Sequence, residues 1–177
     1  MLNELLELAP EIHASNVTAG WWTDLKTGES ILTTRNRGEI LMLVVSELSE
    51  ADEGRRGCLM DDKLPARLMF DVELGDTAIR LLDLIGAEDA MTAVPSEATP
   101  NTLMAIVNLV VAAFEHLRKN RQQEYRDALV TALLGVAYHA RLREVDLLGC
   151  IAEKRAYNAI RADHQIANRL KEDGKQF

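Results

Sequence analysis

Four long segments of the chain carry apolar residues at the three- and four-residue spacing of α-helices. Aliphatic residues are plentiful and turn residues are scarce, because 47% of the chain is apolar, only 5% is aromatic, and Gly and Pro number 10 and 4. This composition argues against a small β-barrel or sandwich. We therefore predict an all-α fold, a single domain over residues 1–177 in which a bundle of four principal helices carries terminal extensions. The expected helices are 39 to 54 or 57, 64–85, about 101–120 and about 122–148.

The two ends of the chain are expected to add smaller elements to this bundle. A short helix over residues 2–8 should stop near Pro10. The segment 15–38 is rich in Gly, Thr, Ser and Asn, and we interpret it as an ordered surface segment anchored by its two tryptophans. The polar C-terminal part, 150–177, is expected to be helical to about Asn158.

The chain is acidic, with a formal net charge of −8 at pH 7. This balance argues against nucleic acid or an anionic membrane as the main partner, because both normally require a basic surface. The longest apolar run, from Leu103 to Phe114, is shorter than the roughly 20 residues that span a bilayer. Acids stand at the N-terminus where a secretory signal needs Lys or Arg, so we expect a cytoplasmic protein. The two cysteines, Cys58 and Cys150, form no disulfide or zinc pattern.

Two pairs of acids lie at the edge of the predicted core. Glu47 and Glu50 are three residues apart and so share one helix face, and Glu73 and Asp76 repeat this spacing on the next helix. Both pairs flank an apolar stripe, so we expect four carboxylates in one interhelical space. A buried carboxylate is strongly unfavourable unless it is protonated or meets a cation. Oxygen ligands on rigid helices suit a hard divalent ion such as Mg²⁺ or Mn²⁺.

The alternative is that these acids are half-exposed and form ordinary surface ion pairs with Arg80, Arg67 or Arg55. A single acidic pair would favour that interpretation. Two pairs on consecutive helices, each at a core boundary, favour a metal site instead. Asp83 lies on the same helix face as Asp76, and it either supports the metal site or pairs with Arg80.

The acidic pattern resembles that of a known protein family. The segments SELSE at 46–50 and ELGD at 73–76 are similar to the ExxE…ExxD signature of the all-α nucleoside triphosphate pyrophosphohydrolases, the MazG-like and dimeric dUTPase superfamily. The segment KRAYNAIR at 154–161 resembles the C-terminal KxxYNxxR element of the family. The likeness covers most of residues 35–86 and 150–177, whereas the helices between them are similar only in type.

One position departs from the family pattern. Many members carry an additional glutamate where this chain has Ser46. If that acid helps to bind metal or water, its role is vacant here or falls to Glu50, Asp52 or Glu53.

The resemblance implies a metal-dependent hydrolase. In the family, four acids bind Mg²⁺, water attacks the α-phosphorus of a nucleoside triphosphate, and pyrophosphate leaves. The metal ligands implied here are Glu47, Glu50, Glu73 and Asp76, of which Glu47 and Glu50 would also be catalytic. The substrate-binding residues implied in the C-terminal element are Lys154, Tyr157, Asn158 and Arg161. The alternative for this element is a solvated basic helix face, since its residues share one face by spacing alone.

Residues that could contact the base of a bound nucleotide lie before the predicted helix that carries Glu47 and Glu50. Trp21 and Trp22 either offer a stacking surface or pin their loop to the core. Asn36 either hydrogen-bonds a base edge or caps the following helix. His164 is a weaker candidate for a phosphate contact. No P-loop pattern and no HExxH pattern occurs in the chain, so the phosphates would have to be bound in another way.

More than one activity is compatible with the resemblance. The compact chain is most similar to the phage-borne MazZ type of the family, which hydrolyses dGTP or GTP for 2-aminoadenine nucleotide synthesis. The alternatives are house-cleaning of non-standard nucleotides, hydrolysis of dUTP or dCTP, and a non-catalytic helical oligomerisation module. In each case we expect a homodimer or homotetramer, because the segment 101–120 has little polar surface to present to water.

Overall fold

The computed structural model describes residues 1–171 and 173–175, and over these residues it contains helices but no strand. The all-α prediction is therefore confirmed. Among the described residues, β-type pairing is limited to two isolated bridges, Thr23 with Ser30 and Met60 with Leu68. The elements in chain order are α1 (Leu2–Leu6), α2 (Ala9–Thr18), α3 (Arg37–Gly57), α4 (Met69–Ala87), α5 (Leu103–Arg118), α6 (Gln122–Leu142), α7 (Leu147–Ile160), the 3₁₀ turn η1 (Ala162–His164) and α8 (Ile166–Arg169).

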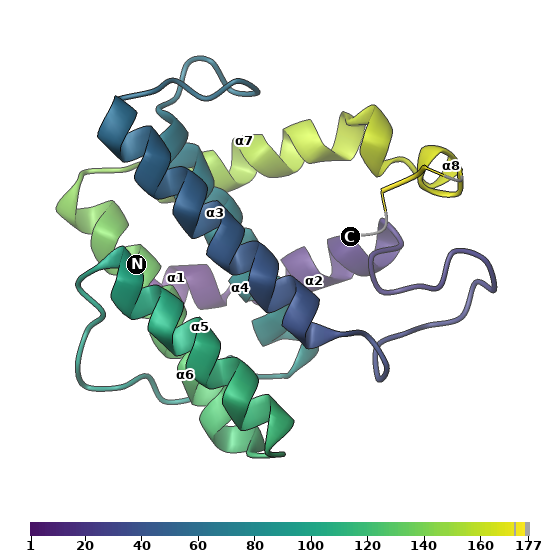
Figure 1. Cartoon of the computed structure of the whole chain (residues 1–177), viewed down its shortest axis with the longest axis horizontal. Coiled ribbons are helices and arrows are strands. Elements are labelled where there is room, and N and C mark those ends of the chain that lie inside the picture. Colours follow the sequence, from purple (N-terminus) through teal and green to yellow (C-terminus); the bar gives the residue numbers. More distant parts are fainter. Residues whose placement is uncertain (172, 176–177) are drawn as a thin grey trace.

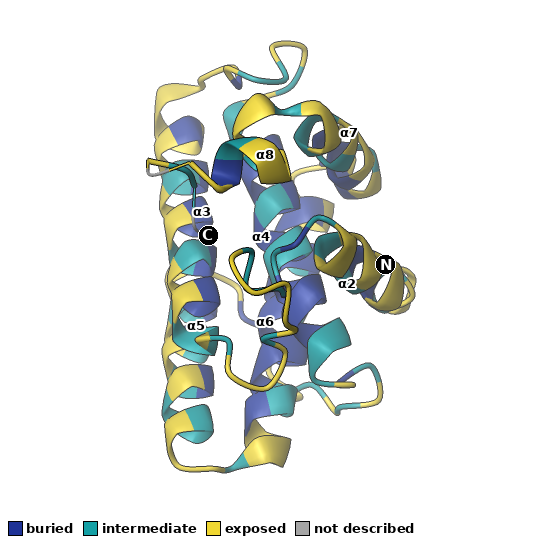
Figure 2. Cartoon of the chain, turned by 90° about the vertical axis from the view of Figure 1, so that its right-hand side faces the viewer, coloured by how far each residue is buried: buried dark blue, intermediate teal, exposed yellow. Residues whose placement is uncertain are grey.

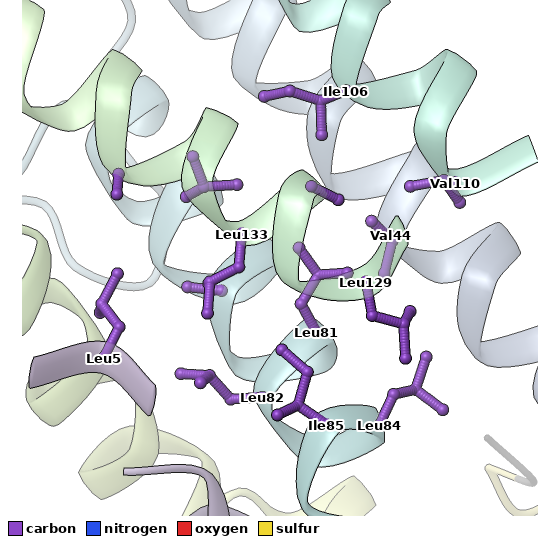
Figure 3. Close-up of a cluster of buried hydrophobic side chains, with 14 of the residues drawn as sticks. Leu5, Val44, Leu81, Leu82, Leu84, Ile85, Ile106, Val110, Leu129 and Leu133 are labelled. Atoms are coloured by element: carbon purple, nitrogen blue, oxygen red, sulfur yellow. The ribbon is translucent and has the colours of Figure 1, made fainter. Parts of the chain in front are cut away.

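Helix α4 is the centre of the molecule. It packs against α2, α3, α6 and α7, while α5 packs on α6 and α3 (Figure 1). Buried residues occupy most of its circumference, and such a helix is stable only when neighbours cover most of its sides. Figure 2 shows the buried residues on the inner sides of the helices and the exposed residues on their outer sides. The core side chains labelled in Figure 3 are Leu5, Val44, Leu81, Leu82, Leu84, Ile85, Ile106, Val110, Leu129 and Leu133.

Helix α3 begins with the cap that the sequence offers. The Asn36 side chain accepts a hydrogen bond from the backbone N–H of Gly38 at 3.0 Å, which satisfies one of the free donors of the first turn. The capping interpretation of Asn36 is therefore confirmed. Because Asn36 is the cap, the helix starts at Arg37, two residues earlier than predicted.

Helix α4 begins at Met69 rather than at Leu64, so this boundary of the prediction is wrong. The Asp61 carboxylate is the reason, because its Oδ1 accepts the backbone N–H groups of Lys63 at 2.9 Å and Leu64 at 2.6 Å. An aspartate that binds the backbone two and three residues later stabilises a turn in place of a helix. Asp61 is only 2% exposed, so this turn is fixed firmly against the helices.

Pro10 starts a helix instead of ending one. Helix α1 already stops at Leu6, and Pro10 lies in the first turn of α2, where no backbone N–H is needed. The short helix predicted over 2–8 is therefore confirmed as α1, although it ends two residues earlier and a second helix, which was not predicted, begins at Pro10. The new helix also takes over the first residues of the expected 15–38 surface segment.

The last two long helices meet at a tight corner. Helix α6 ends at Leu142, before the predicted limit of 148, because Glu144 has a left-handed φ of 56°. The Asp146 side chain then accepts the backbone N–H of Gly149 at 3.1 Å and caps α7. The helix predicted to reach about Asn158 is confirmed as α7, and it ends at Ile160.

Helices α4 and α7 approach each other very closely. A Cβ atom at Gly75 would lie 3.2 Å from the Cβ of Cys150, so a larger residue would push the two helices apart. Cys150 is fully buried in this contact. Arg67 holds α7 from the loop before α4, since its guanidinium donates to Glu153 at 2.6 Å. The position of α7 is thus fixed by close packing and by an ion pair.

Helix α5 is buried on one side only. Its inner face contributes Ile106, Val110 and Ala113 to the core. On its outer face Val111 is 59% exposed and Phe114 is 45% exposed. This single chain therefore leaves an apolar helix face in contact with solvent. Among the described residues, no helix combines the length and the apolar character needed to cross a membrane.

Candidate metal centre

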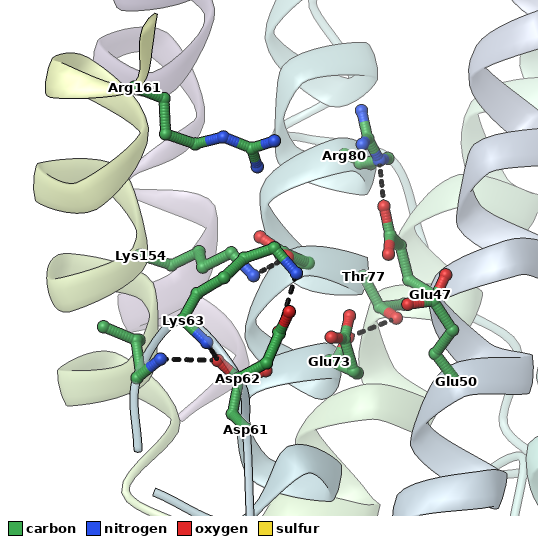
Figure 4. Close-up of polar contacts among 12 residues, drawn as sticks. Glu47, Glu50, Asp61, Asp62, Lys63, Glu73, Thr77, Arg80, Lys154 and Arg161 are labelled. Atoms are coloured by element: carbon green, nitrogen blue, oxygen red, sulfur yellow. Dashed lines mark hydrogen bonds and ion pairs between the residues drawn. The ribbon is translucent and has the colours of Figure 1, made fainter. Parts of the chain in front are cut away.

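Three of the four predicted acids come together where α3 faces α4. One carboxylate oxygen from each of Glu47, Glu73 and Asp76 lies within 4.8 Å of the others. Glu47 and Glu73 are labelled in Figure 4. The i, i+3 spacing of Glu73 and Asp76 puts both on the face of α4 that meets α3, where Glu47 lies at the edge of the core. Distances of this size allow one ion to bind all three carboxylates.

Glu50 lies beside this group without belonging to it. It is half-buried one turn further along α3, and its Oε1 accepts a hydrogen bond from the Ser46 hydroxyl at 3.2 Å. It nevertheless lines the same cavity as the other acids. The computed geometry thus makes Glu50 a neighbour of the predicted metal site and leaves its carboxylate available to a bound molecule.

Glu73 is the least compensated acid of the group. It is 3% exposed, and its Oε2 has no hydrogen-bond partner among the described residues. Burial, reinforced by the Asp76 carboxylate, raises the pKa of Glu73 to about 9. A carboxylate in this position either retains its proton or requires a cation, and a divalent ion would fit the oxygen donors present.

Two basic side chains partly balance the acids. Lys154 Nζ lies 2.6 Å from Asp76 Oδ2, and Arg80 Nε donates to Glu47 Oε1 at 2.7 Å. Burial also raises the pKa of Asp76, although the nearby ammonium of Lys154 opposes this shift. For Lys154, burial would lower the pKa, but the surrounding carboxylates outweigh it and the pKa is raised. Neither cation forms an ion pair with Glu73.

The alternative based on ion pairs holds only in part. Glu47 does pair with Arg80, as that alternative expected. Arg55 instead pairs with Asp52, and Arg67 pairs with Asp146 and Glu153. Asp83 does not pair with Arg80, since it accepts hydrogen bonds from His13 and Trp22.

The acids form one side of a cavity of about 170 Å³ whose other sides are basic. Burial and the charges of Lys175 and Arg161 lower the pKa of His164 to about 4, so this imidazole is neutral at pH 7. Five cationic side chains surround the four acids of this cavity. They come from the loop before α4, from α4 itself, from α7 and its end, and from the C-terminal segment. This arrangement suits a polyanion bound together with a metal ion. The lining residues within the described part of the chain are Glu47, Glu50, Lys63, Glu73, Asp76, Arg80, Lys154, Asn158, Arg161, His164 and Lys175.

The C-terminal element contributes three of its four predicted residues to this cavity. Lys154, Asn158 and Arg161 line it from α7 and its end. The Asn158 Oδ1 atom is buried and accepts no hydrogen bond from the described residues, so it is available to a ligand donor. Tyr157 is absent from the lining, and the Arg161 guanidinium lies over its ring at 5.7 Å from the centroid. The same guanidinium donates two hydrogen bonds to Asp163, at 3.0 and 2.7 Å, so Asp163 and the Tyr157 ring together orient Arg161.

A second cavity of about 100 Å³ adjoins the first. Its lining is mixed, with more polar and charged side chains than apolar or aromatic ones. The residues shared by both cavities are Asp76, Arg80, Asn158, His164 and Lys175. The residues lining only the second cavity of this pair are Asn16, Trp21, Trp22, Arg35, Ile40, Leu43, Ile79 and Asp83.

The two tryptophans fix the walls of this second cavity. Trp22 is 1% exposed and donates its Nε1 hydrogen to Asp83, so it pins the loop before α3 to the core. A base could not stack on this ring without moving the loop. The Arg169 guanidinium covers Trp21 at 3.5 Å from the ring centroid. Asn36 lies outside both cavities, because its side chain caps α3 and donates to Glu39.

Several lining residues were not predicted from the sequence. Arg80 follows Asp76 by four residues, so its place on the acidic face of α4 was readable from helical spacing. Lys63 is brought in by the turn that Asp61 stabilises, and Lys175 by the fold of the C-terminal segment. Neither lysine has a local sequence signal that points to the site.

Comparisons with protein-family models, with curated proteins and with solved structures found no match for the chain.

Proposed function

We propose that the chain binds Mg²⁺ or Mn²⁺ at Glu47, Glu73 and Asp76, next to Glu50, and hydrolyses a nucleoside or deoxynucleoside triphosphate to the monophosphate and pyrophosphate. The observation that carries the proposal is the buried Glu73 carboxylate, whose Oε2 lacks a hydrogen-bond partner within the described chain and which lies in a cavity walled by cations. A bound divalent ion would neutralise charge on the leaving pyrophosphate and acidify the attacking water.

Five side chains of the cavity have specific roles in this proposal. Lys63, Lys154 and Arg161 bind phosphate oxygens, because cationic donors form short, strong hydrogen bonds to phosphate. Glu50 accepts the proton of the attacking water, which its position outside the close group of three acids supports. Asn158 accepts a hydrogen bond from a sugar hydroxyl through its free Oδ1. The heterocyclic base occupies the second cavity, where Ile40, Leu43 and Ile79 offer apolar surface beside polar groups.

Release of pyrophosphate is the first expected result. The purified protein should convert at least one of the eight common nucleoside and deoxynucleoside triphosphates to its monophosphate when Mg²⁺ or Mn²⁺ is supplied, and chelation should stop the reaction. In ¹⁸O-labelled water the label should enter the monophosphate, since the proposal has water attacking the α-phosphorus. Label in the pyrophosphate, or release of inorganic phosphate, would contradict this choice of bond.

The Glu50→Gln variant tests the assignment of the base. Loss of a general base typically lowers kcat by about 100-fold or more. The matched control is Glu124→Gln, which removes an exposed carboxylate in the first turn of α6, away from both cavities. Equal activity in the Glu50 variant and the control would remove Glu50 from the mechanism.

The resemblance also favours particular substrates and one alternative role. Hydrolysis of dGTP or GTP is the first choice within the proposal, and non-standard nucleotides, dUTP and dCTP are the other candidates to include in the substrate panel. The non-catalytic alternative is a helical oligomerisation module, which the exposed apolar face of α5 favours. Calorimetric titration with Mn²⁺ distinguishes this alternative, because a module without a metal site would bind no ion at the acids.

We also propose that a second copy of the chain covers the outer face of α3 and α5. Met42 of α3 is 67% exposed, Met104 and Val111 of α5 are 65% and 59% exposed, and the two helices are packed together, so these side chains form one surface. Apolar surface of this kind is typical of subunit interfaces.

A homodimer or homotetramer is therefore expected in sedimentation or light-scattering measurements. The Val111→Glu variant should shift the protein to a smaller species, because it places an unpaired charge in the interface. Val17→Glu is the matched control, since Val17 is an exposed valine of α2 on another part of the surface. A wild-type chain that is monomeric at tens of micromolar would contradict the proposal.

A further inference from the structure

Lys175 lies where the two cavities of the site meet. Among the described residues, Lys175 and Arg80 are the two cations that line both cavities. Arg80 donates to Glu47 at 2.7 Å and is therefore compensated. For Lys175, the closest carboxylate oxygen of the described chain is Asp163 Oδ2, which lies 3.8 Å from Nζ and already accepts a hydrogen bond from Arg161 at 2.7 Å. Lys175 is thus the less compensated of the two cations.

The ammonium of Lys175 has hydrogens left to donate to a bound anion. Its Nζ lies 3.3 Å from Nε2 of His164, and this imidazole is neutral at pH 7, so the ammonium is the donor and Nε2 the acceptor. An ammonium carries three hydrogens, and this contact uses one of them. Burial and the charge of Arg161 also lower the pKa of Lys175. A negatively charged ligand would offset both effects, because it favours the charged form of the lysine.

Arg169 fixes the backbone of Lys175. The Arg169 side chain is 3% exposed, and its guanidinium lies over the Trp21 ring at 3.5 Å from the centroid. Its Nε donates to the carbonyl oxygen of Lys175 at 3.3 Å, and its Nη1 donates to the carbonyl oxygen of Ala19 at 2.9 Å. This buried side chain therefore ties the C-terminal segment to the loop after α2 and holds Lys175 at the junction of the cavities.

We propose that Lys175 is a further catalytic residue whose ammonium donates a hydrogen bond to a non-bridging oxygen of the α-phosphate, and that Arg169 positions it. This inference rests on the proposed function, which puts the phosphates in the basic cavity and the base in the second cavity. The sugar and the α-phosphate connect these parts of the substrate, so they lie where the cavities meet. Of these two groups, the α-phosphate is the anionic one and therefore the partner for an ammonium.

The reaction makes this contact useful. The water oxygen forms a bond to the α-phosphorus, and the bond from that phosphorus to the oxygen shared with the β-phosphorus breaks. This oxygen leaves with the electron pair as part of pyrophosphate. One proton of the water passes to Glu50, and Lys175 keeps its protons throughout. The non-bridging oxygens carry the negative charge that repels an approaching nucleophile, and a fixed cationic donor reduces this repulsion.

Calorimetry with Lys175→Met tests where the ammonium binds. The titrants are the common nucleoside 5′-monophosphates, which keep the α-phosphate, and inorganic pyrophosphate, which is the leaving group, each with Mg²⁺ present. The variant should bind the monophosphates about 10-fold more weakly than wild type does, the usual effect of losing one hydrogen bond to a charged group. Its affinity for pyrophosphate should be unchanged. Lys63→Met should show the reverse pattern, because Lys63 lines the basic cavity alone.

A second lysine of the same segment provides the matched control. Lys171 is exposed, donates to Asn168 at 2.6 Å and lines neither cavity. Lys171→Met should therefore keep the wild-type affinity for the monophosphates and for pyrophosphate. Its activity should also equal that of wild type.

Steady-state kinetics with the best triphosphate substrate test the catalytic role. Lys175→Met should lower kcat by about 100-fold, a typical effect of removing one fixed donor to a reacting oxygen. Lys175→Arg should retain more activity, because it keeps the positive charge. Arg169→Met should weaken monophosphate binding as Lys175→Met does and spare pyrophosphate binding. The double variant should lose no more than Lys175→Met alone, since the two residues act through one contact.

Four results would overturn parts of the inference. Equal weakening of monophosphate and pyrophosphate binding in Lys175→Met would place the ammonium away from the α-phosphate. Unchanged monophosphate binding in that variant would remove the contact altogether. Wild-type kcat in Lys175→Met would remove the catalytic role. A further loss in the double variant would show that Arg169 acts by another route. Lys175 is 34% exposed, so we expect its variant to fold even if Arg169→Met does not.

The binding data also separate this inference from the proposed function. If the expected binding pattern is found and no pyrophosphate is ever released from a triphosphate, the contact to the α-phosphate stands and the proposed function fails. If pyrophosphate is released by wild type and by Lys175→Met at equal rates, the proposed function stands and the inference fails. Absence of binding by every nucleotide and by pyrophosphate would overturn both.

Discussion

Replacement of Lys154 by methionine is expected to lower the free energy of unfolding of the metal-free protein by about 3–5 kcal/mol, the usual cost of removing one partner of a buried ion pair. Lys154 is 3% exposed, and its ammonium lies 2.6 Å from Asp76. Without this charge, Asp76 has no ion-pair partner among the described residues and remains beside Glu47 and Glu73. The methionine side chain is hydrophobic and similar in length to lysine, but it carries no charge that could compensate for the repulsion among these acids.

Urea denaturation in the presence of a chelator measures this effect. The double variant Lys154→Met/Asp76→Asn should recover most of the lost stability, because it removes the unpaired carboxylate as well. Neither variant should hydrolyse nucleotides at the wild-type rate. Lys119→Met is the matched control, since Lys119 is an exposed residue whose pair with Glu115 contributes little. A loss of less than about 1 kcal/mol in the single variant would show that the pair is not buried in solution.

Replacement of Glu73 by glutamine should remove a pH dependence from the stability of the metal-free protein. Burial raises the pKa of Glu73 from 4.5 to about 9 in the folded state, so the folded chain holds a proton that the unfolded chain releases between these values. Stability should therefore fall by a few kcal/mol as the pH rises from about 5 to 9. Glutamine resembles the protonated acid and does not titrate, so the variant should lack this contribution.

In wild type, but not in the Glu73→Gln variant, metal binding should offset the loss of stability that occurs as the pH rises. At 100 times its dissociation constant, Mg²⁺ or Mn²⁺ should add about 2.7 kcal/mol to the stability of wild type, and the gain should increase with pH because the ligands must lose their protons. The Glu73→Gln variant should gain far less and should lose at least 100-fold in activity, more than the typical effect of changing a residue that only supports a ligand. Equal stabilisation of wild type and variant by the ion would place the metal elsewhere.

Helical spacing predicted the principal helices well. The errors lie at helix ends, where a side chain that hydrogen-bonds the backbone can decide where a helix begins. The four principal helices were found from their apolar periodicity, because each has one face in the core. The start of α4 was misplaced since the Asp61 side chain captures two backbone N–H groups, a competition that a periodic pattern cannot reveal. Helix α1 does end before Pro10, but the same residue is equally suited to a first helical turn, and the helix that it begins is not marked by apolar periodicity.

The acidic part of the site was more readable than its basic and apolar parts. The spacing of Glu73 and Asp76 indicates that they share one face of α4, and the family resemblance pointed to Lys154 on a helix distant in the sequence. Lys63 and Lys175 reach the cavity only through long-range packing, so no local pattern marks them. Asp83 was noticed for its position on α4, but its partners His13 and Trp22 become visible only when the N-terminal segments are docked.

The close contact of α4 with α7 provides a chemical reporter for the opening of the site. Cys150 lies one helical turn before Lys154, and burial raises the pKa of its thiol to about 11, so it reacts with an alkylating reagent only when α7 detaches. Cys58 is exposed and serves as an internal standard for reagent access in the same molecule. The ratio of the two labelling rates therefore gives the free energy of undocking the helix that carries Lys154 and Asn158, with no spectroscopic probe added to the chain.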